Sequence, residues 1–392
     1  MSGPTLRQAV TGIGVSSPLG VPEIPSAQGT PSRALSRRAP VALLLLVAVL
    51  IACVSGCGPQ PTSTQEASAG VEFLQKPSSQ HLRVMSFNPY WDSIFPDDDP
   101  QNDPWRQYGK SAEFVRIVQA VQPDVVCLQE INPVRDPQQV ADILAAVLPP
   151  GEGESWHAHS GEDNVIAARF DLRLRDSERV IPGTGTGFGH AVALIDLPDA
   201  AYAQDLYLVC AHFKSQGGQA NIEARQAHAD AIVHWIRDLQ TPGGAVDLPA
   251  RTPIVVLGDL NVYDTDPAYH LTTLLTGDIV NEADYGPDTP PDWDGTPLAD
   301  ALPRHNGTGE ETYTWRDDTQ PYNPGELDRI LYTDSVLSVD HAFVLNTMAM
   351  TKADLAAAGL EAGDVLLNPS TGHYDHLPLV VDFALRGPGE EP

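Results

Sequence analysis

Short apolar runs alternate with longer amphipathic segments from about residue 80 onward. The short runs are rich in β-branched residues and bounded by Gly, Pro, Asp and Asn, which is the pattern of strands. They cover Arg83–Phe87, Asp124–Gln129, Asn164–Ala168, Ala191–Leu197, Asp205–Ala211, Ile254–Gly258, Leu327–Tyr332 and Leu379–Phe383. The longer segments have apolar residues at helical spacing. They predict helices over Ser111–Val121, Asp136–Val147, Ile222–Leu239, Pro267–Leu275 and Lys352–Ala358, joined by loops at 94–105, 149–163, 284–298 and 317–325. The alternation predicts one mixed α/β domain.

The amino-terminal part of the chain has a different character. Arg33, Arg37 and Arg38 precede an apolar run at 41–52, which is too short for a comfortable membrane span and is typical of a targeting segment. Cys53 and Cys57 each follow small residues in a pattern that resembles the bacterial lipobox. We expect Cys57 to be the lipidated residue, because a stretch of Gly, Pro, Gln, Ser and Thr follows it.

These features divide the chain into four parts. We expect a signal peptide with a lipobox-like end at 1–57, a flexible tether at 58–79, the folded domain at 80–387 and a tail at 388–392. A coil of about 20 residues would reach roughly 25 Å from a membrane surface. The predicted location is outside the cytoplasm, as a bacterial lipoprotein anchored to a membrane; secretion is the alternative.

The charge of the chain is strongly negative. It has 23 Lys and Arg against 52 Asp and Glu, a formal net charge of −29. Such a surface repels polyanions at long range, because nucleic-acid affinity normally rests on basic residues that neutralise phosphates. A nucleic-acid substrate then requires a metal ion and a local basic group in the cleft. Cys127 and Cys210 lie in apolar runs, where we expect two buried free thiols, with a disulfide as the alternative.

Six short polar segments lie at or just past predicted strands. They are Ser86–Asn88, Leu128–Glu130, Ala211–Ser215, Gly258–Asn261, Glu326–Ile330 and Tyr374–His376. The carboxyl ends of strands are where α/β proteins gather their sites. Each segment alone also has an ordinary structural interpretation as a turn or a surface strand end. Together they offer oxygen ligands, two imidazoles and a lysine, which is the inventory of a phosphoester-cleaving site.

The residue types suit that chemistry. Glu130 ends a buried run, where a carboxylate needs a partner or a cation, and with Asn88 it would suit Mg²⁺. Asp259 and Asn261 are two residues apart in extended chain and face the same side, so they could act on one water or phosphoryl oxygen. His212 and Lys214 share that spacing and could contact a phosphate.

A carboxylate that orients an imidazole fixes its tautomer and stabilises its charged form. For the imidazole of His376 we expect Asp328 to have this orienting role. The two residues lie far apart along the chain, so their pairing is a hypothesis that only the fold can bring about.

In this order and spacing, the six segments resemble those of the endonuclease/exonuclease/phosphatase superfamily, with its DNase I-like fold, over essentially all of 80–387. The resemblance implies a four-layer α/β/β/α sandwich of two mixed β-sheets flanked by helices. It also implies phosphoester hydrolysis with Mg²⁺ or Mn²⁺, by in-line attack of water. By motif match the metal-site residues are Asn88, Glu130 and Asp375, and the catalytic residues are His212, Asp259, Asn261, Asp328 and His376.

The segment His212–Ser215 most resembles the secreted nuclease branch. We therefore expect a nuclease; a phosphodiesterase or phosphatase acting on phospholipid head groups or small phosphoesters is the alternative, and a non-catalytic binding protein is least favoured. Tyr90 departs from the family pattern, because some nuclease members carry an acid there. The expected partners are nucleic acid and, through the lipid anchor, a membrane, with a monomeric protein. Further substrate-binding residues are expected at Lys214, Asn164, Arg169 and His190.

Overall fold

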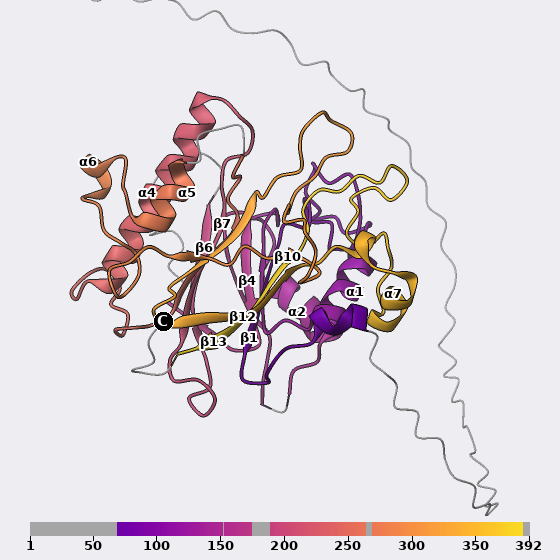
Figure 1. Cartoon of the computed structure of the whole chain (residues 1–392), viewed down its shortest axis with the longest axis horizontal. Helices are drawn as coiled ribbons and strands as arrows, with labels where there is room; N and C mark the ends of the chain where they lie inside the picture. The colour runs from indigo at the N-terminus through magenta and orange to yellow at the C-terminus, as the bar shows by residue number, and fades with distance from the viewer. Residues whose placement is uncertain (1–68, 152, 175–188, 264–268, 387–392) are drawn as a thin grey trace, which may run out of the picture. The chain divides into compact units, whose positions relative to one another are not determined.

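The computed structural model describes residues 69–151, 153–174, 189–263 and 269–386 (Figure 1). They belong to one compact unit, Thr64–Pro392. The predicted signal peptide, including Cys57, and the tail at 388–392 lie outside the described residues. Among the described helices, none combines the length and apolar character needed to cross a membrane.

Seven strands form the first sheet, in which β1 runs parallel to β2 and β10 parallel to β12, while the other neighbours are antiparallel. The spatial order is β10 (Arg304–His305), β12 (Leu337–Val344), β13 (Leu379–Leu385), β1 (Leu82–Phe87), β2 (Val125–Leu128), β4 (Asn164–Ala168) and β3 (His157–Gly161). The first and last of the predicted strands are therefore neighbours in the middle of this sheet.

Six strands form the second sheet, in which β7 and β8 are parallel and the other pairs antiparallel. The order is β5 (Asp171–Arg173), β6 (His190–Asp196), β7 (Leu206–His212), β8 (Ile254–Asp259), β11 (Asp328–Tyr332) and β9 (Ala299–Asp300). Both sheets are mixed, as the sequence predicts.

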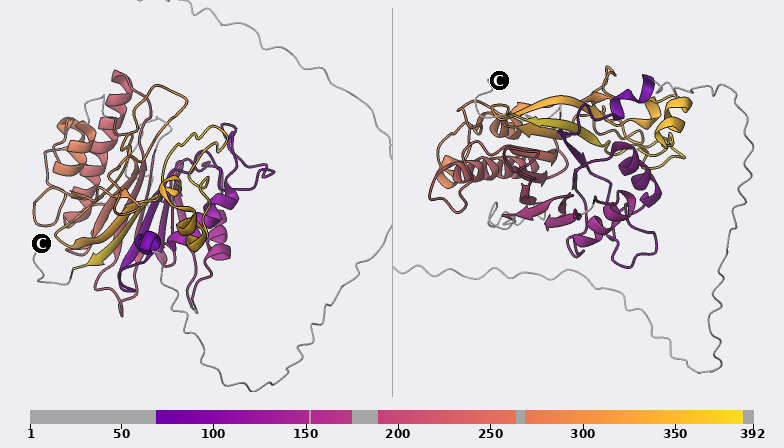
Figure 2. Two further views of the ribbon diagram at one scale, coloured as in Figure 1. Left: turned by 45° about the vertical axis from the view of Figure 1, so that its right-hand side comes forward. Right: turned by 90° about the horizontal axis from the view of Figure 1, so that it is seen from below.

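The two sheets pack face to face between two layers of helices (Figure 2). On β7, Leu208 and Cys210 point to the core between the sheets, while Tyr207 and Val209 point outward to α4 (Gln219–Gln240). The helices α4 and α5 (Tyr269–Thr276) cover the second sheet, and α1 (Ser111–Val121) and α2 (Gln138–Val147) cover the first. The predicted four-layer sandwich is confirmed.

Burial on both faces explains why the central strands are almost wholly apolar. Each fully buried Val, Leu or Ile side chain stabilises the fold by roughly 1.5–3 kcal/mol, since its surface is removed from water. Short elements complete the unit; these are η1 (Ala69–Leu74), α6 (Glu282–Tyr285), η2 (Thr347–Ala349) and α7 (Lys352–Ala358).

The folded domain begins earlier than residue 80. The 3₁₀ helix η1 lies inside the range 58–79 that the sequence predicts as a tether, yet its Val71 and Leu74 are buried in the core. Burial of these two apolar side chains stabilises the packing of η1 against the domain. The carboxyl-terminal part of the tether prediction is therefore wrong, while 58–68 lie outside the described residues.

Gly258 fixes how closely the two strands that carry the site can approach. Its φ is +132°, and a Cβ atom there would lie 2.1 Å from the carbonyl oxygen of Ala211 on β7. A larger residue would push β8 away from β7, because both the backbone conformation and the space require glycine. The next residue pair in this register is His212 opposite Asp259, so Gly258 holds these two side chains at contact distance.

Candidate active site

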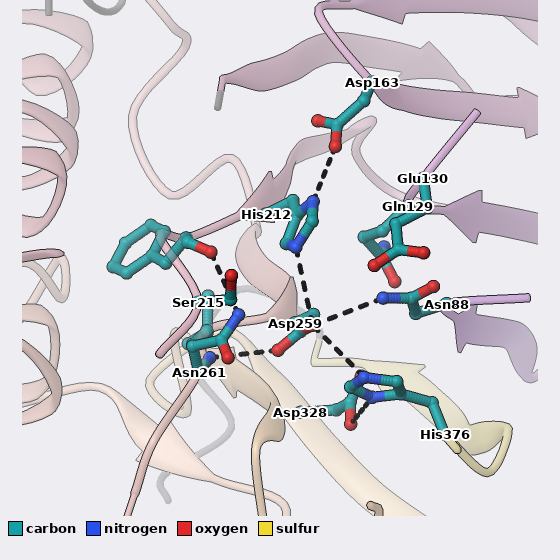
Figure 3. A network of polar contacts seen from close by, with 12 residues as sticks. Asn88, Gln129, Glu130, Asp163, His212, Ser215, Asp259, Asn261, Asp328 and His376 are labelled. Carbon is teal, nitrogen blue, oxygen red and sulfur yellow. Dashed lines mark hydrogen bonds and ion pairs between the residues drawn. The ribbon is translucent and has the colours of Figure 1, made fainter. Parts of the chain in front are cut away.

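Polar side chains from both sheets meet at one edge of the sandwich (Figure 3). From the first sheet come residues just beyond β1 and β2, just before β4 and just before β13; from the second come residues at the ends of β7 and β8 and at the start of β11. These positions are occupied by Asn88, Glu130, Asp163, His376, His212, Asp259 and Asp328. The edge is assembled only when the two sheets pack together.

Asp259 is the centre of this group. Its Oδ2 atom lies 3.6 Å from Nε2 of His212 and 3.4 Å from Nε2 of His376, and it accepts a hydrogen bond from Nδ2 of Asn88 at 3.3 Å. Its Oδ1 atom accepts the backbone N–H of Asn261 at 3.0 Å. The carboxylate is 2% exposed, so these donors replace the water that it has lost.

Asp328 and His376 are in the contact that the sequence predicts. Nδ1 of His376 lies 2.7 Å from Oδ2 of Asp328, which also accepts the hydroxyl of Thr314 at 2.7 Å. Burial opposes a charge on the imidazole, but Asp328 and then Asp259 outweigh it and raise the pKa of His376 well above its usual value. The ring is therefore a fixed, protonated donor at neutral pH.

His212 has a matching partner that the sequence did not single out. Its Nδ1 atom lies 2.6 Å from Oδ2 of Asp163, the residue before β4. Burial again opposes the charge, and the attraction of Asp163 and Asp259 raises the pKa of His212 to about 9. The only signal in the sequence was an aspartate directly before Asn164, inside a range predicted as a loop.

Glu130 and Asn88 offer oxygen atoms at the rim of the same group. Oε2 of Glu130 accepts the N–H of Trp91 at 3.1 Å, and burial raises the pKa of Glu130 to about 7, with Asp375 adding to the effect. A carboxylate that is costly to ionise next to further acids is suited to a divalent cation, which would supply the missing positive charge. Oxygen ligands of this kind fit Mg²⁺ or Mn²⁺.

Asp375 joins this rim from the segment before β13. Its Oδ1 atom accepts Nε1–H of Trp315 at 3.2 Å, and burial raises its pKa, with Asp259 adding to the effect. Ligand atoms of Asp259, Asp328 and His376 also lie within 4.8 Å of one another, close enough to hold a metal. Glu130, Asn88 and Asp375 are a second candidate ligand set, because their oxygen atoms meet at the rim beside that group.

The side chain of Asn261 is fixed by two hydrogen bonds. Its Nδ2 atom donates to the carbonyl of Phe213 at 2.9 Å, and its Oδ1 atom accepts the hydroxyl of Tyr263 at 2.9 Å. The residue has φ +49°, a conformation that asparagine tolerates better than most residues. This turn aims Asn261 along the same edge as Asp259.

The four predicted substrate-binding residues have different locations. Lys214 lies beside the site and is partly buried, with Nζ donating to the carbonyl and hydroxyl oxygens of Ser215 at 3.2 and 3.3 Å. Asn164 is close to the site but fully buried, and its Nδ2 atom donates to the carbonyl of Gly189 at 2.9 Å. The side-chain amide of Asn164 therefore links the start of β4 to the residue before β6.

Arg169 and His190 do not fit the predicted role. Arg169 follows the far end of β4, where its N–H donates to the carbonyl of Asp124 before β2; β4 is antiparallel to β2, so this is the opposite edge of the sheet. His190 is 3% exposed and packs edge-on to His228 at 5.1 Å between ring centroids. Burial lowers the pKa of His190 well below its usual value, so it supplies no positive charge for a phosphate.

The two cysteines of the domain are buried and free. Sγ of Cys210 accepts Nε2–H of Gln129 at 3.2 Å, and burial raises the pKa of the Cys127 thiol. Both thiols are part of the core behind the site, which agrees with the expectation of two buried free thiols.

Comparisons with known proteins address the family. The Endonuclease/Exonuclease/phosphatase family matches residues 85–352. Among solved structures, the catalytic domain of human Nocturnin with bound sulfate has 17% identity and a TM-score of 0.46, covering 78% of this chain and 95% of that one. The Bacteroides vulgatus endonuclease/exonuclease/phosphatase has 17% identity, TM-score 0.47 and coverages of 78% and 99%. D. rerio TDP2 complexed with a single-strand DNA product has 18% identity, TM-score 0.44 and coverages of 78% and 99%.

No curated protein matches the chain. The family match covers more than half of the sequence and includes the strand ends that carry Asn88, Glu130, His212, Asp259 and Asp328. The chain therefore belongs to the endonuclease/exonuclease/phosphatase family of phosphoester hydrolases.

Proposed function

We propose that the protein is a divalent-metal-dependent nuclease that cleaves phosphodiester bonds by in-line attack of water. The observation that carries this proposal is the arrangement of two buried Asp–His pairs around Asp259, with the oxygen rim of Glu130 and Asn88 beside them. The two fixed, positively charged donors, His212 and His376, lie next to a cation site and would together attract and orient a negatively charged phosphoryl group.

In this mechanism Glu130, Asn88 and Asp375 would hold the metal. A bound Mg²⁺ or Mn²⁺ would neutralise charge that grows on the phosphoryl oxygens. His212 and His376 would donate hydrogen bonds through Nε2 to the non-bridging oxygens, since each Nδ1 is engaged by its own aspartate. Lys214, two residues after His212, would contact a neighbouring phosphate.

The attacking water needs a group that takes its proton. Asp259 and His376 are the two candidates. His376 is protonated at neutral pH because of the carboxylates around it, and a protonated ring cannot accept a second proton. We therefore assign the proton acceptor to Asp259, with Asn261 steadying the water. The water oxygen forms the new bond to phosphorus, and the bond from phosphorus to the leaving oxygen breaks.

A phospholipid head group or small phosphodiester is the second candidate substrate. Trp105 and Val134 are 70% and 72% exposed on the two loops beside Glu130. Those loops are joined by a hydrogen bond from Nδ2 of Asn132 to the carbonyl of Gln101 at 3.2 Å. Exposed Trp is enriched where proteins meet a membrane interface, and the acidic surface disfavours a polyanionic nucleic acid.

A substrate panel separates these proposals. The purified full chain would be incubated with Mg²⁺ or Mn²⁺ and with plasmid DNA, single-stranded RNA, phosphatidylcholine and sphingomyelin vesicles, or bis-p-nitrophenyl phosphate. Cleavage of a nucleic acid at a higher kcat/KM than any lipid supports the nuclease, and the reverse order supports the lipid enzyme. Cleavage of none with metal present contradicts the enzymatic proposal.

Glu130→Gln tests the metal assignment on whichever substrate is cleaved. We expect a loss of about 10²-fold or more at low metal, partly recovered at high metal, because the side chain keeps its size but loses its charge. EDTA should abolish activity of the wild type and Mg²⁺ should restore it. His341→Gln, on β12 and bound to Asp382, is the control and should stay near wild-type activity.

We also propose that the protein is lipidated at Cys57, acts outside the cytoplasm and is a monomer. The support is the lipobox-like sequence that follows Arg33, Arg37 and Arg38. Mass spectrometry of the mature amino terminus in a bacterial host tests the first two points. A diacylglyceryl group on Cys57 is expected; cleavage before Cys53 or at a site without a lipid would contradict this assignment.

A further inference from the structure

Three consecutive non-glycine residues after β1 have positive φ. They are Tyr90 at +69°, Trp91 at +37° and Asp92 at +61°, and Glu130 across the turn has +58°. A side chain at such angles costs free energy, so the surrounding structure must hold it there. N–H groups of this turn contact Asn88 and Glu130, the oxygen ligands of the proposed metal site, so the contacts that hold the turn also affect that site.

The turn and Glu130 are joined by direct hydrogen bonds. The N–H of Trp91 donates to Oε2 of Glu130 at 3.1 Å, and the N–H of Asp92 donates to the carbonyl of Glu130 at 3.0 Å. At the start of the turn, the N–H of Tyr90 donates to Oδ1 of Asn88 at 3.1 Å. The left-handed backbone thus orients the oxygen atoms of both Glu130 and Asn88.

Asp92 is the anchor of the turn. Its carboxylate is 0% exposed and accepts the N–H of Asn132 at 2.9 Å through Oδ1 and the N–H of Asp103 at 2.8 Å through Oδ2. These bonds tie the turn to the loop after Glu130 and to the loop at 94–105. A buried carboxylate also needs a counter-charge.

Arg135 supplies that counter-charge. Its Nε atom lies 3.0 Å from Oδ2 of Asp92, and the arginine side chain is 1% exposed. The guanidinium is itself fixed, because it lies 3.5 Å from the centre of the Phe95 ring and donates to Asp99 at 3.1 Å and to Asn102 at 2.7 Å. Arg135 touches neither Glu130 nor Asn88 through any of these bonds; it acts on them through Asp92.

We propose that the buried Asp92–Arg135 ion pair is a positioning device that holds the strained turn 90–92, and through it Glu130 and Asn88, in the geometry that binds the divalent cation. The inference rests on the proposed metal site. It assigns Asp92 and Arg135 a role in metal affinity although neither would be a ligand.

The first sheet, whose strands β1 and β2 lead into the turn and the Arg135 loop, contains a matched control. Arg83 and Asp382 form a bidentate ion pair with two contacts of 2.6 Å, and their side chains are 2% and 0% exposed. Arg83 is near the opposite end of β1 from Asn88, about 16 Å away at the rise of a strand. Loss of this pair removes an equally buried charge contact without touching the turn.

The test measures cation binding directly rather than turnover. Mn²⁺ would be titrated into the full chain and its free concentration followed by electron paramagnetic resonance, for the wild type, Asp92→Asn, Arg135→Lys and Asp382→Asn. We expect the Mn²⁺ Kd to rise about 10-fold or more in Asp92→Asn, to rise less in Arg135→Lys, and to stay within about twofold in Asp382→Asn. Thermal unfolding without metal would be measured for all four.

The outcomes separate a positioning role from a structural one. If Asp92→Asn and Asp382→Asn lower the unfolding midpoint alike and leave the Mn²⁺ Kd unchanged, the proposal is overturned. Should Asp92→Asn fail to fold, Arg135→Lys carries the test, since a lysine keeps the charge and loses the planar fork.

The same titration is independent of the substrate. A wild type that hydrolyses no phosphoester while Asp92→Asn still weakens Mn²⁺ binding would refute the proposed function and leave this inference standing. If the wild type cleaves a phosphodiester but Asp92→Asn leaves the Mn²⁺ Kd unchanged, the proposed function stands and this inference is refuted.

Discussion

His212 and Phe213 are consecutive residues, yet their side chains enter two regions of opposite character. His212 faces the active-site edge, where Asp163 and Asp259 lie 2.6 and 3.6 Å from its ring nitrogens. Phe213 faces a cluster of buried histidines from β6, α4 and α5, whose ring centroids lie 5.8, 5.3 and 5.9 Å from its own; these are His190, His228 and His270.

The two regions are both buried but differ in their carboxylates. Burial opposes the charge of each histidine; next to Asp163 the pKa of His212 nevertheless rises to about 9, whereas the pKa of His228 and of His270 falls to about 4. Acidic side chains, Asp163 just before β4 of the first sheet and Asp259 on β8 of the second, therefore decide which histidines carry a proton. The charged histidines lie at the candidate site, and the neutral ones pack around Phe213.

The largest expected effect comes from the carboxylate that both charged histidines share. Asp259→Asn keeps the shape of the side chain but removes the negative charge and the proposed proton acceptor. We expect kcat/KM to fall about 10³-fold, within the range of acid–base catalysis. Steady-state kinetics on the best substrate of the panel measure this loss. Asp300→Asn, which lies on the edge strand β9 and pairs with Arg329, should remain within about twofold.

Next in size is the removal of the charged rings. His212→Gln and His376→Gln should each lower kcat by about 10²-fold. Because both rings contact the same Oδ2 atom of Asp259, the loss in the double variant should be smaller than the product of the single losses. A strictly multiplicative loss would mean that the two Asp–His pairs act independently, against the shared arrangement seen here.

The neutral histidines should determine acid stability. The pKa of His270 is lowered from 6.5 to about 4 by burial and then by Arg225. The unfolded chain therefore binds more protons as pH falls from about 6.5 to about 4, and stability is lost in that window. His270→Gln keeps a donor for the carbonyl of Leu260 and removes the titration. Between pH 7 and 4.5 its free energy of unfolding should fall by about 2 kcal/mol less than that of the wild type.

Urea unfolding at the two pH values measures this difference. His234→Gln on the exposed face of α4 is the control. Equal acid sensitivity in the wild type and His270→Gln would show that burial of this ring does not destabilise the fold in acid.

The smallest expected effect tests why the pKa of His212 is high while the pKa values of His228 and His270 are low. Activity should fall as pH rises through about 9, since His212 loses its proton there. Asp163→Asn removes the strongest attraction on that proton, so the alkaline limb of kcat/KM should move to lower pH by about one unit. A pH profile at saturating Mg²⁺ records the shift. An unmoved limb would assign it to another group.

Much of the fold follows from the periodicity of the sequence. The helix Ser111–Val121 has the predicted bounds because its apolar residues recur on one face, and the buried strands β4 and β8 contain continuous apolar runs at 165–168 and 254–257. By contrast, β3 has the sequence His-Ala-His-Ser-Gly, which predicts a loop; as an edge strand it needs little apolar surface. On β12, Asp340 and His341 interrupt the alternation.

These misses explain the errors at the site. Because the sequence does not predict β3, it places Asp163 in a loop. The structure places Asp163 in the tight turn between β3 and β4, where it contacts His212. Strand direction explains the opposite error at Arg169, because a run of apolar residues does not reveal which way a strand points. Asp328 and His376 could be paired from the family resemblance, although they are separated by 48 positions.

The place of β13 has a consequence for biosynthesis. This last strand lies between β12 and β1 in the middle of the first sheet, and His376 lies three residues before its start. The first strand, β1, therefore completes its backbone hydrogen bonds only when β13, the last strand, has been synthesised and pairs with it. A growing chain cannot assemble the pair of Asp328 and His376 until nearly all of it has been made, so the candidate site is completed only at the end of synthesis.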